Sequence, residues 1–239
     1  VTLNFHRNKR NITLDLKNAD DMALLLELLA DADLLVESFR PGVMARLGLA
    51  WAQLKERFPR LIMASVSGYG QTGPMAQTGG FDVMAQGMSG LMSISGSRDG
   101  PPHRLPIPIC DLAAGLYLTI GVLAALQARH RTGRGQYVET SLLEAATALQ
   151  VYEAVHYFSS GENPPRMGQA HRGVAPYQVF PSADGYVTIG AGQQHFYEAF
   201  CRLAEVPELV TDVRFIRVSD RVANNDELDV VHIYANEED

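Results

Sequence analysis

The chain has 239 residues, of which 46% are hydrophobic and 20% are charged. This composition is typical of a folded globular protein and excludes a disordered chain. Its 20 Lys and Arg against 27 Asp and Glu give a net charge of −7, which argues against nucleic acid as the main partner. Two cysteines, Cys110 and Cys201, are too few for a disulfide framework or a cysteine metal site, and they indicate a reducing, cytoplasmic compartment.

The first part of the chain alternates amphipathic segments with short apolar runs. Apolar residues spaced three and four apart predict a helix over 18–32, and a second helix is predicted over 51–57. The apolar runs 34–37 and 61–67 predict strands, the second of which ends at the breakers of 68–74. This strand–helix–strand order predicts parallel pairing and an α/β layer fold.

The longest helix is predicted over 111–131, after a short helix over 83–88. Asp111 is expected to cap it, and the basic residues 129–131 precede a terminating glycine. Its apolar stretch, 112–126, is shorter than the roughly 20 residues that a membrane span needs, so no membrane partner is expected.

A strand over 136–139 and a helix over 141–159 complete a large first domain, expected over residues 1–160. The Gly-Glu-Asn-Pro-Pro segment that follows opens a linker, expected over 161–175.

The remaining residues, 176–239, predict a smaller α+β domain. Strand-like runs over 177–180 and 186–190 are joined by Ser-Ala-Asp-Gly at 182–185, a good hairpin turn. A helix is predicted over 195–204.

Gly68-Tyr69-Gly70-Gln71-Thr72-Gly73 matches GxGxxG after a strand, the pattern of a dinucleotide-binding turn. That turn needs a helix starting at the glycines, whereas Pro74, Gly79 and Gly80 follow here. The favoured interpretation is a loop at the end of a strand, which can still line a ligand site. The seven histidines lack HExxH spacing and no GxSxG turn occurs, so neither a metal site nor a serine hydrolase is supported.

Two carboxylates are candidates for chemistry. Asp111 follows the extended apolar segment 106–110 and opens the longest helix, where the helix dipole and free N–H groups favour the anion. An ordinary capping aspartate is the simpler interpretation, but such a carboxylate can also attack an activated acyl group. Asp99, before Gly100, is a rival that is also typical of a turn.

Seven separated motifs follow one another in a fixed order along the chain. They are Asn8–Lys17, Ala32–Gly42, Arg46–Leu49, Ser67–Pro74, Gly80–Asp82, Ser89–Met92 and Thr132–Gln136. Together they resemble the class III CoA-transferase (CaiB/BaiF) family, and the resemblance runs from Asn8 to about Asp229.

The resemblance implies a Rossmann-like large domain, incomplete here at its N-terminal end, a smaller α+β domain and an interlocked homodimer. It implies transfer of coenzyme A (CoA) from an acyl-CoA to a carboxylic acid, with a succinyl-CoA-like donor as the favoured case. Acyl-CoA and a small carboxylic acid are then the substrates, and no other cofactor is implied.

The resemblance also implies site residues. The family's catalytic aspartate matches Asp111, which would carry the acyl group as a mixed anhydride and then CoA as an aspartyl thioester. The family's CoA contacts, with Arg46 as the expected phosphate partner, match Leu14, Asp15, Leu16, Lys17, Ser38, Phe39, Arg40, Arg46, Leu47, Gly79, Gly80, Phe81 and Asp82.

Two alternatives stay open. The α-methylacyl-CoA racemases of the same family use a histidine at the position of Phe81 and a glutamate at that of Gln193, and both departures favour a transferase. An inactive CoA-binding member is the other alternative. Family members extend beyond both ends of this chain and 230–239 departs from the family pattern, so a truncated fragment is expected.

Overall fold

The structure is a computed structural model that describes residues 6–182 and 184–228. The chain forms two compact units, Val1–Leu91 with Arg104–Ser160 and Met92–His103 with Gly161–Asp239. The segment Met92–His103 therefore belongs with the second unit, which no sequence pattern indicated. The boundaries expected at 160 and 175 stay predictions, and the expected departure from the family pattern over 230–239 lies outside the described residues.

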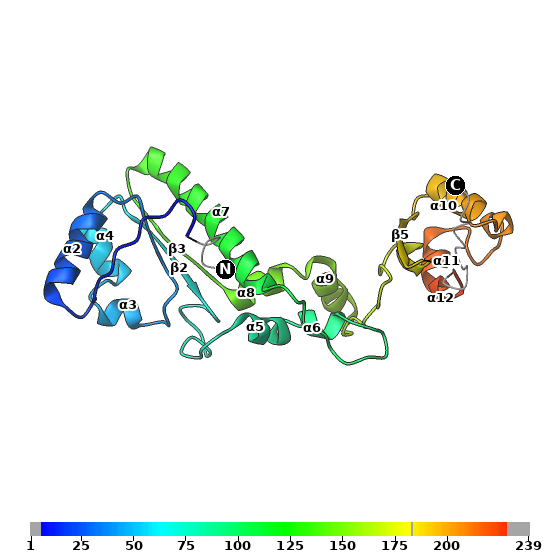
Figure 1. The fold of residues 1–239 in the computed structure, drawn as a ribbon, viewed down its shortest axis with the longest axis horizontal. Coiled ribbons are helices and arrows are strands. Elements are labelled where there is room, and N and C mark those ends of the chain that lie inside the picture. Colours follow the sequence, from blue (N-terminus) through cyan, green and yellow to red (C-terminus); the bar gives the residue numbers. More distant parts are fainter. Residues whose placement is uncertain (1–5, 183, 229–239) are drawn as a thin grey trace. The chain divides into compact units, whose positions relative to one another are not determined.

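The elements follow one another as shown in Figure 1. The strands are β1 (Leu34–Glu37), β2 (Ile62–Ser67), β3 (Tyr137–Ser141), β4 (Tyr177–Pro181) and β5 (Tyr186–Gly190). The helices are α2 (Ala19–Ala30), α3 (Val43–Arg46), α4 (Trp51–Arg57), α5 (Asp82–Met88), α6 (Leu91–Ile94), α7 (Ile109–Thr132), α8 (Leu142–Ala148), α9 (Val151–Ser160), α10 (Gln194–Leu203), the 3-10 helix η1 (Pro207–Val210), α11 (Val218–Ala223) and α12 (Asn225–Leu228).

The first unit is built on a parallel sheet in the order β1-β2-β3. Leu34 lies opposite Ile62, and Met63 lies opposite Tyr137. The parallel pairing and the α/β fold expected from the sequence are confirmed. Because parallel strands end at one edge of a sheet, the loops after β1 and β2 begin on the same side.

Side chains alternate between the two faces of this sheet. Met63 and Tyr137 pack with helices α2, α3 and α4 on one face, whereas the neighbouring Ala64 and Val138 pack with α7 on the other. Figure 1 shows α2 and α7 on opposite sides of the strands. Since successive strand residues point to opposite faces, each face gains its own helical layer and its own core.

Arg129, near the end of α7, ties that helix to the starts of β1 and β2. Its guanidinium donates to the Asp33 carboxylate at 2.7 Å and to the Arg60 carbonyl at 2.9 Å. The Arg129 side chain is buried, and these hydrogen bonds compensate the cost of removing its charge from water.

Two helix expectations are wrong. The helix expected to start with Asp111 begins at Ile109, so Asp111 lies in its first turn and is not its cap. The helix expected over 141–159 is two helices, α8 and α9. At the junction the Gln150 side chain donates to the Ser89 carbonyl, and Val151 takes a positive φ of 32°.

The helix α7 is 24 residues long and, within the described residues, is the one helix long and apolar enough to cross a membrane by length and composition. The apolar stretch 112–126 is only part of this helix, which continues to Thr132. Its Leu118 and Val122 pack against β2 and β3, as expected of the core helix of a globular domain. That no membrane is a partner stays a prediction.

The second unit combines the antiparallel pair β4-β5 with the helix α10, and the expected hairpin is confirmed. Ser182 N–H donates to Gly185 O across the turn, whose Ala183 lies outside the described residues. Tyr197, Phe200 and Cys201 of α10 are buried in the core of this unit.

Arg221 is a fully buried cation in that core. Its guanidinium donates to the carbonyls of Ala175 at 3.0 Å, Phe215 at 2.9 Å and Gly192 at 3.0 Å. Its Cζ lies 4.3 Å from the centre of the Tyr197 ring. The side chain therefore joins three backbone segments, and burial lowers its pKa.

Candidate active site

Asp111 is exposed in the first turn of α7, in the first unit. Pro108, which precedes the helix, makes no side-chain cap. Instead, Asp82 at the start of α5 supplies the acceptor: its Oδ2 accepts Cys110 N–H at 2.8 Å and Asp111 N–H at 3.3 Å. Two carboxylates therefore lie together at the amino end of the longest helix.

The electrostatics of Asp111 differ from the expectation. The sequence placed Asp111 where free N–H groups would favour its anion, but Asp82 takes two of those groups. Burial, followed by the negative charge of Asp82, raises the pKa of Asp111. The pKa of Asp111 is therefore shifted upward, whereas the helix terminus alone would shift it downward.

Cys110 stands next to this carboxylate and is fully buried. Burial raises the pKa of its thiol to about 11, and the charge of Asp82 adds to the effect. A thiol with this pKa is protonated at neutral pH and is a poor nucleophile. The nucleophilic candidate at this point of the chain is therefore Asp111.

Close backbone packing brings the loops around β1 and β2 together. A Cβ at Gly79 would lie 3.1 Å from Nη2 of Arg40, so the guanidinium rests on that glycine. A Cβ at Gly68 would lie 2.6 Å from the Cα of Gly80, so these two glycines touch through their backbones. The loop after β1, the glycine loop after β2 and the turn into α5 are thus in mutual contact.

The other expected CoA contacts lie nearby in the chain. Arg46, in α3, approaches the loop after β1, because a Cβ at Gly42 would lie 3.2 Å from its Nη1. Leu47 packs against the core under α2. The segment Leu14–Lys17 precedes α2, and within it Lys17 N–H donates to the Asp15 carboxylate at 3.0 Å.

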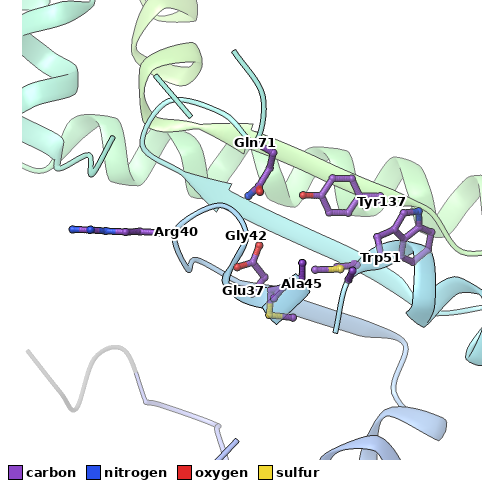
Figure 2. Close-up of a pocket in the computed structure, with 10 residues that line it drawn as sticks. Glu37, Arg40, Gly42, Ala45, Trp51, Gln71 and Tyr137 are labelled. Atoms are coloured by element: carbon purple, nitrogen blue, oxygen red, sulfur yellow. The ribbon is translucent and has the colours of Figure 1, made fainter. Parts of the chain in front are cut away.

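A cavity of about 150 Å³ opens beside the loop after β1. Figure 2 shows Trp51 and Tyr137 close together in it and Arg40 extending from the loop on the other side. The Trp51 and Tyr137 rings stack with centroids 6.2 Å apart. Glu37 and Gln71 add a carboxylate and an amide, so the cavity combines an aromatic wall with polar groups.

The glycine motif over 68–73 forms a loop at the end of a strand, which was the favoured interpretation. Gly70 and Gly73 both have a φ of 95°, which suits a loop, and the next helix, α5, starts only at Asp82. Gln71 from this loop lines the cavity. The rival carboxylate Asp99 is exposed in the second unit, whereas Asp111 belongs to the first.

Sequence reasoning missed two residues of this region. Glu37 is a buried carboxylate that ends β1 and accepts Phe39 N–H at 2.9 Å. Gln86 is a fully buried amide that donates to Asp82. A charged residue at the end of an apolar strand was the available signal for Glu37. For Gln86 the signal was its position four residues after Asp82 on the same helix.

No group of three or more metal-ligating side chains occurs within 6–182 and 184–228.

The fold and this site define an α/β protein with an exposed carboxylate beside glycine loops, and the sequence assigns it to a family. Residues 1–234 match CoA-transferase family III, so the chain belongs to that family. The match extends beyond the range of 8–229 expected from the motifs, and it includes part of the segment expected to depart from the family pattern.

Curated relatives and solved structures agree with this assignment. The chain is 42% identical over 93% of its length to an acetyl-CoA:oxalate CoA-transferase of Acetobacter aceti. It is 37% identical over 95% of its length to a succinyl-CoA:glutarate CoA-transferase of Mus musculus. The crystal structure of a CaiB/BaiF family protein from Brucella suis superposes with a TM-score of 0.80 at 37% identity, covering 93% of this chain and 59% of that one.

The chain spans only part of the relatives it matches. It covers 58% of the Acetobacter aceti protein and 52% of the Mus musculus protein.

Proposed function

We propose that the protein is a CoA-transferase that moves CoA from an acyl-CoA to a carboxylic acid through Asp111. The observation that carries the proposal is an exposed carboxylate in Cys110-Asp111-Leu112-Ala113-Ala114-Gly115, at the amino end of the longest helix of a family III chain. The neighbouring thiol is buried and protonated, which leaves the carboxylate as the nucleophile.

The proposed reaction is a series of acyl exchanges. An Asp111 carboxylate oxygen attacks the thioester carbonyl, the C–S bond breaks, and CoA leaves as a thiolate from a mixed anhydride. The thiolate attacks the Asp111 carbonyl carbon, which releases the donor acid and forms an aspartyl-CoA thioester. The acceptor carboxylate then displaces CoA to form a second anhydride, and the thiolate attacks the acceptor's carbonyl carbon, which frees Asp111. Division into covalent steps replaces one difficult exchange by several easier ones.

The CoA would lie along the loops that converge near β1 and β2. Arg40 and Arg46 offer guanidinium groups for its phosphates, which planar guanidinium binds well. The other proposed contacts are Leu14, Asp15, Leu16, Lys17, Ser38, Phe39, Leu47, Gly79, Gly80, Phe81 and Asp82, the last through its backbone.

The acceptor is proposed to be a small dicarboxylic acid and the donor a short acyl-CoA such as succinyl-CoA. The named relatives support this class, since oxalate and glutarate are both dicarboxylates. No further cofactor is proposed beyond CoA as a substrate.

Assembly and location belong to the same proposal. The first unit is proposed to be Rossmann-like, and the protein to form an interlocked homodimer in the cytoplasm. Support for a partner comes from an apolar stripe on α7 that is exposed in this chain, formed by Leu112, Leu116, Ile120 and Leu123.

The racemase alternative lacks a proton carrier. Phe81, which stands where racemases have a histidine, is 69% exposed and has no group that can exchange a proton. A transferase should leave the α-hydrogen of 2-methylacyl-CoA in place in deuterium oxide. Rapid α-hydrogen exchange without any acceptor acid would instead identify a racemase.

The proposed function is tested by a substrate screen. Acetyl-CoA, succinyl-CoA and oxalyl-CoA are each incubated with a panel of mono- and dicarboxylic acids, and new acyl-CoA products are identified by mass spectrometry. We expect at least one donor–dicarboxylate pair to exchange, Asp111→Ala to abolish exchange, and the matched carboxylate variant Asp99→Ala to retain it. Full exchange by Asp111→Ala would refute the proposal.

A further inference from the structure

We propose that Asp82 is a positioning residue, which fixes the first turn of α7 under Asp111 and thereby sets the rate of acyl transfer. The inference rests on the proposed function of Asp111. It changes the role that the family resemblance gives to the Asp82 side chain, which is a contact with CoA. A backbone contact between this turn and CoA remains compatible with it.

Asp82 caps the amino end of helix α7. Helix α7 begins after Pro108, whose side chain cannot accept a hydrogen bond, so its first N–H groups need an acceptor from elsewhere. Asp82 Oδ2 supplies it, at 2.8 Å from Cys110 N and 3.3 Å from Asp111 N. The reacting residue is thus held through its own backbone N–H by a side chain 29 positions earlier in the chain.

The other oxygen of Asp82 also accepts a hydrogen bond. Its Oδ1 accepts the Gln86 side-chain amide at 2.5 Å. Gln86 is fully buried, and its own carbonyl oxygen accepts Leu105 N–H at 2.8 Å while its amide nitrogen lies 3.4 Å from Ile107 O. One buried side chain therefore connects Asp82 to the segment that leads into α7.

This arrangement requires more than one acceptor on Asp82. Both oxygens of Asp82 accept hydrogen bonds, one from a helix terminus and one from an amide. A carboxylate offers acceptors on both oxygens, whereas asparagine offers one acceptor and one donor. An asparagine at this position would therefore point its NH2 group at another donor, either the helix N–H groups or the Gln86 amide. The site selects aspartate for its hydrogen-bonding geometry, independently of any contact with CoA.

The consequence for catalysis is geometric. A carboxylate that attacks a thioester carbonyl must reach it along a narrow approach, so a small displacement of its backbone reduces the rate strongly. Loss of the cap loosens the turn that carries Asp111. The Arg40 and Arg46 guanidinium groups, the proposed phosphate contacts, stay in place when the cap is lost.

The test separates positioning from binding by comparing kcat and KM. For Asp82→Ala we expect kcat to fall about 10-fold or more, since one lost cap of ~1.4 kcal/mol corresponds to 10-fold, with KM for acyl-CoA unchanged. Asp82→Asn, which keeps one acceptor, should lie between Asp82→Ala and the wild type. Asp20→Asn, in the first turn of α2, is the matched control and should leave both constants unchanged. A higher KM with an unchanged kcat would overturn the proposal and assign Asp82 to CoA binding.

A second measurement does not depend on activity. Amide hydrogen exchange at Cys110 and Asp111 should be about 10-fold faster in Asp82→Ala than in the wild type, while exchange at Val122 in the middle of α7 should stay the same. Unchanged exchange at the first turn would overturn the capping role. A wild-type protein that transfers no CoA would instead overturn the proposed function, so the two failures are distinguishable.

Discussion

At the scale of single residues, the properties of Asp111 come from its neighbours more than from its helix. Asp82 takes the N–H groups of the first turn, and burial together with the charge of Asp82 raises the pKa of Asp111. A carboxylate whose anion is less stabilised holds its electron pair less tightly, which favours attack on an acyl carbon. The proposed positioning residue, Asp82, therefore also raises the pKa of the proposed nucleophile.

The buried thiol of Cys110 leads to a prediction about how the free energy of unfolding depends on pH. Burial raises the pKa of its thiol to about 11 in the folded protein, above the ordinary value of an exposed thiol. Between roughly pH 9 and 11 the unfolded chain therefore loses a proton that the folded chain keeps, so the free energy of unfolding falls as pH rises. Urea unfolding on both sides of this window should show a smaller fall for Cys110→Ala than for the wild type. Equal falls in both proteins would contradict the assignment.

How far the sequence predicts the site depends on the range of the interactions. Asp111 became the candidate nucleophile through a motif and its place near a helix start, both of which are local features. The cap that it receives from Asp82 joins residues far apart in the chain, so no local pattern contained it. Gln86 was missed in part for the same reason, because its carbonyl oxygen accepts Leu105 N–H from a distant segment, whereas the contact of Glu37 with Phe39 N–H is local and its signal was not used.

At the scale of elements, the contact of Gly68 with Gly80 carries a prediction about the site loops. A Cβ at Gly80 would lie 2.5 Å from Gly68 Cα, so Gly80→Ala must push two backbone segments apart. We expect Gly80→Ala to lower the free energy of unfolding by about 2 kcal/mol and to weaken CoA binding. Calorimetry and CoA titration measure the two effects.

Gly115 provides the opposite control. It lies inside α7 with open space where a Cβ would be, so Gly115→Ala should stabilise the protein by roughly 0.5–1 kcal/mol. A destabilised Gly115→Ala protein, or a Gly80→Ala protein as stable as the wild type, would show that the loop packing is described incorrectly.

Arg221 carries the corresponding prediction for the second unit. Arg221→Met keeps most of the side-chain volume but leaves three carbonyl oxygens, two of them buried and one partly buried, without their donor. At about 1 kcal/mol for each lost hydrogen bond, this change should lower the free energy of unfolding by about 3 kcal/mol. Arg202→Met, on the exposed side of α10, is the control and should have little effect. Denaturant unfolding followed by the fluorescence of tyrosines in this unit would decide between these outcomes.

The elements themselves were largely predictable because their signals are local. Apolar runs predicted β1 and β2, and the spacing of apolar residues predicted α2, whose start the Asn18 side chain caps by accepting Asp20 N–H and Asp21 N–H. The break between α8 and α9 was not predictable, since neither Gly nor Pro marks it and Gln150 uses its side chain on a distant carbonyl. Such a break depends on tertiary contacts, which override helix propensity.

At the scale of the whole molecule, the exposed stripe on α7 leads to a prediction about assembly. Leu116 and Ile120 are 67% and 61% exposed, and a solvated row of large apolar side chains is unfavourable unless a partner covers it. Light scattering should give twice the chain mass of 26.2 kDa. The double substitution Leu116→Glu and Ile120→Glu should restore the monomer mass. A wild-type monomer at high concentration would contradict the proposed dimer.

Asp111 is proposed to carry the acyl group and then CoA covalently. The most direct measurement adds hydroxylamine during turnover with acyl-CoA, digests the protein and examines the peptide that contains Asp111 by mass spectrometry. Hydroxylamine attacks an activated aspartyl carbonyl, so we expect a hydroxamate on Asp111 only when acyl-CoA is present, and none in Asp111→Asn. A protein that exchanges thioesters at full rate with no modification of Asp111 would contradict this role of Asp111.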